Sequence, residues 1–235
     1  AASQPPSSLR LRAGSTITTK QAINALVTKS ANDVAVVVAE RLGGSEARFA
    51  TLMTAKAQAM GMESTTFKNA SGLPNSQQLS TARDMAVLAE RLLDDHADYY
   101  GYFSNKKFSW GRATYKNHNR LIGDVEGVDG IKTGYTRASG FNLMTSAKRR
   151  GRRVVAIMFG GSTARSRDQH VTDLVEAAYK SFEPTETTPE VQLRMSFSQI
   201  QPPVDPNGAA MPVLNGKVFG SNIVVAEGDE GSKSN

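Results

Sequence analysis

The chain has 235 residues, with 28 Lys and Arg against 22 Asp and Glu, and it contains no Cys. Hydrophobic residues make up 39% and charged residues 21%, which is typical of one globular domain and excludes collagen-like, coiled-coil and wholly disordered classes. The lack of Cys excludes disulfides, cysteine zinc sites and a thiol nucleophile. No apolar run approaches the roughly 20 residues of a membrane-spanning helix. The small, polar residues 1–8 do not resemble a signal peptide.

The composition changes near residue 182. Residues 1–182 hold 25 basic and 15 acidic residues, and we expect them to form one domain. Residues 183–235 hold 3 basic and 7 acidic residues and 6 of the 9 Pro, which predicts an acidic, extended or disordered tail. An Asn-Gly pair between apolar residues favours a short hairpin near 213–218. The basic residues look scattered apart from a cluster at 148–153, which reads as an exposed hairpin turn, so we expect no nucleic-acid binding.

The first half of the domain carries helical periodicity. A capping box, T-x-x-Q from Thr18 to Gln21, opens a first helix, and Ser30 to Asp33 interrupts it. A second helix ends at Gly43-Gly44, a third begins after Ser45, and a fourth begins after Thr81. A long ordered loop is expected over 64–80. The residues expected on the apolar faces of these four helices are, in order, Ile23, Leu26 and Val27; Val34, Val37, Val38 and Leu42; Phe49, Leu52, Met53 and Met60; and Met85, Leu88, Leu92 and Leu93.

The second half changes to strand periodicity. Aromatic residues around Gly111 suggest two short strands, and three later runs at 128–135, 140–147 and 154–159 predict an antiparallel meander. A last amphipathic helix is expected over 166–182, with Val171, Leu174, Val175 and Ala178 on its apolar face. The predicted fold class is therefore α+β, an antiparallel sheet flanked by helices.

Two short motifs carry candidate chemistry. Ser30-Ala31-Asn32 lies between two helices and places a hydroxyl and an amide on one side of a turn, although such a Ser or Asn also serves as a helix cap. Lys132-Thr133-Gly134 puts a cation, a hydroxyl and a residue without a side chain at the end of a strand, where an extended peptide can pair. The structural alternative is an exposed Lys132 followed by a bulge at Gly134.

Together the two motifs resemble the set of the penicillin-recognising serine enzymes. The sequence resembles the serine D-alanyl-D-alanine carboxypeptidases, the low-molecular-mass penicillin-binding proteins, through most of residues 1–182. The segments that carry the resemblance are 25–33, 70–74, 80–85, 117–119 and 128–136. It implies the transpeptidase fold, a bacterial periplasmic or envelope location, and an acyl-enzyme formed with a peptidoglycan stem peptide ending in D-Ala-D-Ala or with a β-lactam.

The resemblance also implies roles for individual residues. Ser30 would relay a proton to the leaving amine, and Lys132 would stabilise negative charge and poise Ser30. Substrate contacts are implied for Asn32, Thr133, Gly134, the backbone N–H of Tyr135, and Arg167. Arg165 competes with Arg167 for the same role. His118 stands where some relatives have Arg, and we interpret it as a polar residue at the rim of the cleft.

The family's nucleophile motif, S-x-x-K, has no counterpart among the 29 residues before Ser30. The match at Ser104 to Lys107 follows the fourth helix, so its order in the chain is wrong and we interpret it as chance. We therefore expect a domain incomplete at its N-terminus, inactive alone and marginally stable, with Val27, Val34 and Val37 short of packing partners. A separate N-terminal fragment of the same protein would be its partner.

Two other readings stay open. One is a non-catalytic module that binds cell-wall peptides, and the other is a basic polyanion binder, for which the polyanionic cell wall is one candidate partner. The three His residues are far apart in the sequence and form no H-E-x-x-H motif, so no metal is expected. No phosphate-binding or dinucleotide-binding motif is present, and no cofactor is expected. Carboxypeptidase, endopeptidase and transpeptidase activities share these motifs.

Overall fold

A three-stranded antiparallel sheet forms the centre of the computed structural model, which describes residues 1 and 3–182. The strands β3 (Val128–Thr136), β4 (Gly140–Arg149) and β5 (Arg152–Gly161) lie in the order β3-β4-β5, which confirms the predicted meander. The β4–β5 turn lies at Arg150-Gly151, where both residues have positive φ, so the basic cluster at 148–153 forms a hairpin as expected. The hairpin proposed near 213–218 lies outside the described residues.

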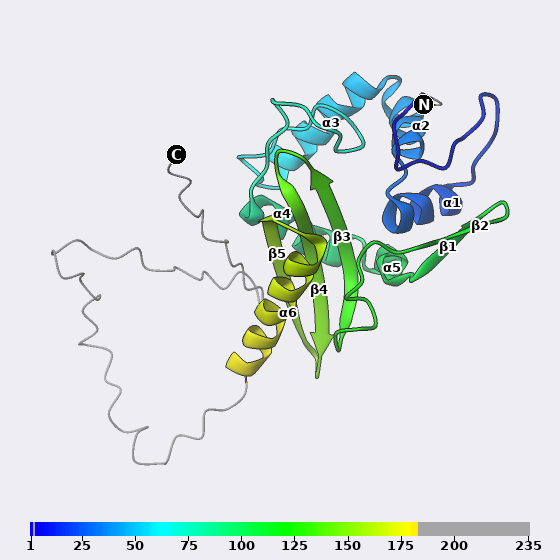
Figure 1. The fold of residues 1–235 in the computed structure, drawn as a ribbon. Helices are drawn as coiled ribbons and strands as arrows, with labels where there is room; N and C mark the ends of the chain where they lie inside the picture. The colour runs from blue at the N-terminus through cyan, green and yellow to red at the C-terminus, as the bar shows by residue number, and fades with distance from the viewer. Residues whose placement is uncertain (2, 183–235) are drawn as a thin grey trace, which may run out of the picture.

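Helix α6 (Ala164–Ser181) covers one face of this sheet (Figure 1). Thr163 caps its N-terminus by accepting the backbone N–H of Ser166. The predicted apolar face is confirmed, because Val171 and Val175 are fully buried in a cluster with Leu143 of β4. Burying an aliphatic side chain of this size stabilises the fold by about 1.5–3 kcal/mol.

Helix α4 (Ala82–Asp95) packs against β5 and contributes to a second apolar cluster with Ile131 of β3 and Ile157 of β5. Thr81 caps this helix as predicted, by accepting the backbone N–H of Asp84. The Asp84 carboxylate in turn accepts bonds from the loop over 64–80, which ties that loop to the helix. Both sides of the sheet therefore carry a helix, as the α+β prediction requires.

The N-terminal helices form a separate layer beside the sheet (Figure 1). Their bounds are α1 (Thr19–Asn24), a π-helical turn η1 (Ala25–Lys29), α2 (Asn32–Gly43) and α3 (Glu46–Ala59). The capping box at Thr18 and the cap at Ser45 are confirmed, and Gly44 ends α2 with a left-handed backbone.

The predicted apolar faces of α2 and α3 were partly wrong. Leu42 is 68% exposed and Leu52 is 48% exposed, whereas Gly43 of α2 lies directly against Phe49 of α3. A side chain at Gly43 would lie 2.8 Å from the Phe49 Cβ, so close approach at this position excludes a larger residue. The expectation that Val27 and Val34 lack packing partners was also wrong, since both are buried, and only Val37 is half-buried.

A short hairpin projects beside α1, formed by β1 (Lys107–Trp110) and β2 (Ala113–Lys116) (Figure 1). It confirms the two strands expected around Gly111. The connection from α4 runs through α5 (Ala97–Tyr100) and a 3₁₀ turn η2 (Gly101–Ser104). The Ser104 hydroxyl donates to the Asp129 carbonyl and Lys107 is exposed at the start of β1, so this S-x-x-K match does not lie on a buried helix.

Within residues 1 and 3–182, no helix combines the length and apolar character needed to span a membrane.

Candidate active site

Ser30 lies in a tight turn between η1 and α2, in the left-handed region with φ 56° and ψ 48°. A residue other than Gly costs about 1–2 kcal/mol in this conformation, so the surroundings must hold it there. The next residue, Ala31, is fully buried, and the backbone N–H of Asn32 donates to the Ser7 carbonyl at 2.7 Å. One residue further, the Asp33 carboxylate accepts backbone N–H groups of the N-terminal segment, including that of Leu9. Before Ser30, the Ser7 hydroxyl donates to the Lys29 carbonyl at 2.8 Å, so the turn is fixed on both sides.

Lys132 reaches this turn from β3, 102 residues further along the chain. Its Nζ donates to the Ser30 Oγ at 2.6 Å and to the Thr133 carbonyl at 2.7 Å. Its neighbour Ile131 is 1% exposed in the cluster beneath α4, so strand alternation directs Lys132 to the opposite face. The sequence predicted that the two motifs meet, and the structure brings Ser30 and Lys132 into direct contact.

The Lys132 ammonium is placed where a positive charge is costly. Burial, followed by the positive charge of Arg167, lowers the pKa of Lys132 to about 8. An amine with a pKa close to neutrality exchanges protons readily, which suits a group that assists proton transfer. The structure rules out the structural alternative, an exposed Lys132 followed by a bulge at Gly134. The side chain is half-buried, Gly134 pairs in register with Asn142, and the irregularity in β3 lies between Val128 and Gly130.

His118 is the third group around the hydroxyl. It lies in the loop after β2, and its Nδ1 is 3.4 Å from the Ser30 Oγ. Asn119 anchors this loop, since it is buried and its amide donates to the Gly130 carbonyl at 2.9 Å. Desolvation and the positive charges of Lys132, Lys29 and Arg167 lower the pKa of His118. A neutral imidazole can accept the Ser30 proton while Lys132 donates to the same oxygen. The sequence placed His118 at a cleft rim and missed this contact.

Arg167 lies in the first turn of α6, where it is 4% exposed. Its guanidinium donates to the Asp168 carboxylate and to the Asn142 carbonyl at 3.3 Å. Arg165, the competing candidate, is exposed. Gly161 makes room for Arg167, because a Cβ at Gly161 would lie 2.9 Å from the Arg167 Cβ. Of the two arginines, only Arg167 has a charge that acts on the pKa of Lys132.

The remaining candidates border Ser30 and β3. Asn32 is buried, and its amide donates to the Pro5 carbonyl at 3.0 Å, so a backbone carbonyl already occupies this donor. Thr133 is half-buried and Gly134 is exposed on β3. A Cβ at Gly134 would meet only Asn142, at 3.9 Å, so the space beside the strand at this position is open. Tyr135 is 60% exposed and stacks on Phe141 with ring centroids 4.4 Å apart.

The fold and the Ser30–Lys132 contact define the class: the α+β fold of penicillin-binding proteins and DD-peptidases. The chain belongs to the D-alanyl-D-alanine carboxypeptidase family, whose model matches residues 2–163.

Individual relatives agree with this assignment. The D-alanyl-D-alanine carboxypeptidase DacF of Bacillus subtilis is 37% identical over 192 residues, which cover 78% of this chain and 48% of the relative. The crystal structure of DacD from Francisella tularensis matches with a TM-score of 0.72 and 26% identity, over 76% of this chain and 56% of that one. Penicillin-binding protein D2 of Listeria monocytogenes, in its ampicillin-bound form, matches with a TM-score of 0.64 and 32% identity, over 69% of this chain and 68% of that one. The chain thus spans about half the length of the curated relatives it matches.

Proposed function

We propose that this chain provides the Ser30–Lys132 half of a serine-type D-Ala-D-Ala carboxypeptidase active site. The observation that carries the proposal is the 2.6 Å contact between the Lys132 Nζ and the Ser30 Oγ. A hydroxyl held between an amine of lowered pKa and a neutral imidazole can pass a proton toward a leaving amine. The substrate is a peptidoglycan stem peptide ending in D-Ala-D-Ala, the same groups bind β-lactams, and the protein acts in the bacterial envelope or periplasm.

Each neighbouring residue has a role in this proposal. The Asn32 side-chain amide leaves the Pro5 carbonyl and binds the substrate backbone. The edge of β3 at Gly134 pairs with the extended peptide. Thr133 and Arg167 bind the terminal carboxylate, since a hydroxyl and a guanidinium are suited to that group. The Tyr135 backbone N–H stabilises the oxyanion. Residues 1–182 form the catalytic half-domain, and the acidic tail expected over 183–235 lies outside the described residues.

The acylated serine itself comes from outside this sequence, because no S-x-x-K motif precedes Ser30. We expect the 235-residue chain to bind a tripeptide ending in D-Ala-D-Ala weakly and reversibly, and to take no covalent label from a fluorescent penicillin. A segment carrying S-x-x-K, joined to the chain or associated with it, would restore labelling. Covalent labelling of the isolated chain, confirmed by intact mass, would contradict this assignment of the nucleophile.

The binding test uses amide chemical shifts of the 235-residue chain. Titration with the D-Ala-D-Ala tripeptide is expected to shift signals of β3 and the Ser30 turn, whereas the L-Ala-L-Ala peptide is the matched control. Lys132→Met and Thr133→Val should each reduce the shifts. Equal response to both peptides, or shifts confined to another surface, would favour a different ligand. A module that only binds wall peptides predicts the same shifts but no D-Ala release from any form that contains the S-x-x-K segment.

A further inference from the structure

The positive charge of residues 1–182 is concentrated in two segments. Residues 1–32 and 99–123 contain nine Lys and Arg and no Asp or Glu, whereas the other residues of 1–182 contain 16 basic and 15 acidic residues. The surplus therefore belongs almost entirely to these two segments, and it is not scattered as the linear sequence suggested. The nine residues are Arg10, Arg12, Lys20, Lys29, Lys106, Lys107, Arg112, Lys116 and Arg120.

The two segments fold into one body, called here the basic lobe. Leu9 and Ala25 of the first segment share an apolar cluster with Phe108 of the second. The Asn105 amide donates to the Asn24 side-chain oxygen at 2.7 Å, which joins the two segments across 81 positions. Figure 1 shows the β1–β2 hairpin running beside α1 at one side of the molecule. Nine charges from distant parts of the sequence thus lie on one lobe.

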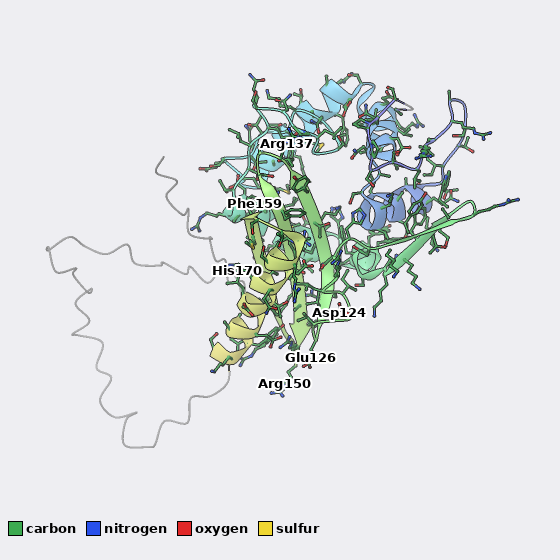
Figure 2. The ribbon with its side chains drawn as sticks, viewed as in Figure 1. Asp124, Glu126, Arg137, Arg150, Phe159 and His170 are labelled. Carbon is green, nitrogen blue, oxygen red and sulfur yellow. The ribbon has the colours of Figure 1, made fainter. Side chains whose placement is uncertain are left out.

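These charges face solvent. All nine are exposed except Lys29, which is half-buried with its Nζ over the Tyr115 ring at 4.9 Å. None of them forms an ion pair with a carboxylate of residues 1 and 3–182. The first carboxylates after the second segment, Asp124 and Glu126, lie near the far end of the central sheet from α3 (Figure 2). Two carboxylates do contact the lobe, because Asp33 accepts the Leu9 backbone N–H and Asp129 accepts the Tyr100 hydroxyl, but neither pairs with any of the nine basic side chains.

The β1–β2 hairpin is destabilised by like charges that lie opposite each other. Lys107 and Lys116 are direct partners in the β1–β2 register, with Arg112 at the turn between the strands. Like charges placed directly opposite each other on a ladder are destabilising. An anion that binds across the hairpin would remove this repulsion, so the arrangement favours a multivalent acidic ligand.

We propose that the basic lobe binds the carboxylate-bearing peptides of peptidoglycan that surround the stem peptide being cleaved. This inference rests on the proposed function. The Ser30 turn belongs to the lobe, so a wall polymer lying on it places its acidic peptides beside the site. The side chains on the lobe argue against single-stranded nucleic acid. None of the exposed large hydrophobic side chains of residues 1 and 3–182 lies within the lobe apart from Tyr99 at its start, and strand binding by nucleic-acid proteins uses stacked aromatics.

Co-sedimentation of the 235-residue chain with purified peptidoglycan sacculi tests the proposal. The lobe variant is Lys107→Gln, Arg112→Gln and Lys116→Gln, and the matched control is Arg41→Gln, Lys56→Gln and Arg83→Gln, three exposed positions on α2, α3 and α4. The lobe variant should bind about 5- to 50-fold more weakly, and the control within about 2-fold of wild type. Binding should fall steeply between 50 and 300 mM NaCl, and sacculi with amidated carboxyls should bind as weakly as the lobe variant binds intact sacculi.

Equal losses in both variants, or unchanged binding to amidated sacculi, would overturn the proposal. Tighter binding to duplex DNA than to sacculi, lost in the lobe variant, would overturn it in favour of nucleic acid. Thermal unfolding of each variant shows that the fold is retained. Lys132→Met separates the two proposals, because it should reduce the response to the D-Ala-D-Ala tripeptide while sacculus binding persists. If neither wild type nor Lys132→Met distinguishes the D- from the L-peptide, the proposed function fails while the lobe result stands.

Discussion

Lys132 should make the folded chain less stable at neutral pH, and the Lys132→Met variant measures by how much. Its pKa is lowered from 10.5 to about 8 by burial and by Arg167. Since each pKa unit corresponds to about 1.4 kcal/mol, the folded state bears a cost of about 3 kcal/mol whenever Lys132 is charged in both states. That cost is complete below pH 8, decreases between pH 8 and 10.5, and is absent above 10.5.

Methionine also removes two hydrogen bonds, from the Lys132 Nζ to Ser30 and to the Thr133 carbonyl. Each is worth about 0.5–1 kcal/mol at any pH. Lys132→Met should therefore stabilise the chain by about 1–2 kcal/mol at pH 7 and destabilise it by about 1–2 kcal/mol at pH 10.5. Urea unfolding at both pH values gives the two differences. Lys148→Met, an exposed lysine on β4, is the control and should change stability by less than about 0.5 kcal/mol at either pH.

The informative quantity is the change between the two pH values, because the lost hydrogen bonds cancel from it. A difference between Lys132→Met and wild type that is the same at pH 7 and pH 10.5 would show that the ammonium is solvated. In that case Lys132 could not act as a proton-exchanging group near neutrality, and the proposed role of the Ser30–Lys132 pair would lose its electrostatic basis.

Other changes report on the site and the core. Lys132→Met should raise the pKa of His118 by removing a nearby positive charge, and an NMR titration of the imidazole would measure it; an unchanged pKa would place Lys132 too far away to act. Leu143→Ala, at a fully buried position, should cost about 2–5 kcal/mol in urea unfolding, whereas Leu42→Ala, 68% exposed, should cost less than about 0.5. Thr81→Ala should cost about 1 kcal/mol through the lost helix cap, and no loss would mean that solvent replaces the cap.

The sequence predicted the parts of the fold that depend on local signals. The caps at Thr18, Ser45 and Thr81 and the order of β3 to β5 were correct, because capping and strand alternation involve residues close in the chain. The contact faces of α2 and α3 were not, because hydrophobicity alone favoured large residues such as Leu42. Close packing through Gly43 is a property of the helix pair that neither helix reveals by itself.

For the site, the family motifs predicted that Ser30 and Lys132 meet, but the sequence did not predict the contact between His118 and Ser30. A single His in a loop carries no periodic signal, and its contact with Ser30 depends on how β2 and β3 are placed in space. The amino-acid sequence already contains part of the signal for the basic lobe. Counting carboxylates separately in each segment shows the asymmetry, although only the fold shows that residues 1–32 and 99–123 lie together.

The charges around Ser30 connect the stability of the chain to its proposed substrate. Lys132, Lys29 and Arg167 all act on the pKa of His118 in the same direction, and the nearest carboxylate partner of Arg167 is its neighbour Asp168. Such a site favours binding of an anion, since a substrate carboxylate would relieve repulsion among three cations and raise the pKa of Lys132 toward its usual value. Substrate binding near pH 8 should then be accompanied by proton uptake at Lys132. The same event that places the scissile bond would charge the amine beside Ser30, so part of the cost of burying Lys132 is recovered only when the acidic end of a peptide is bound.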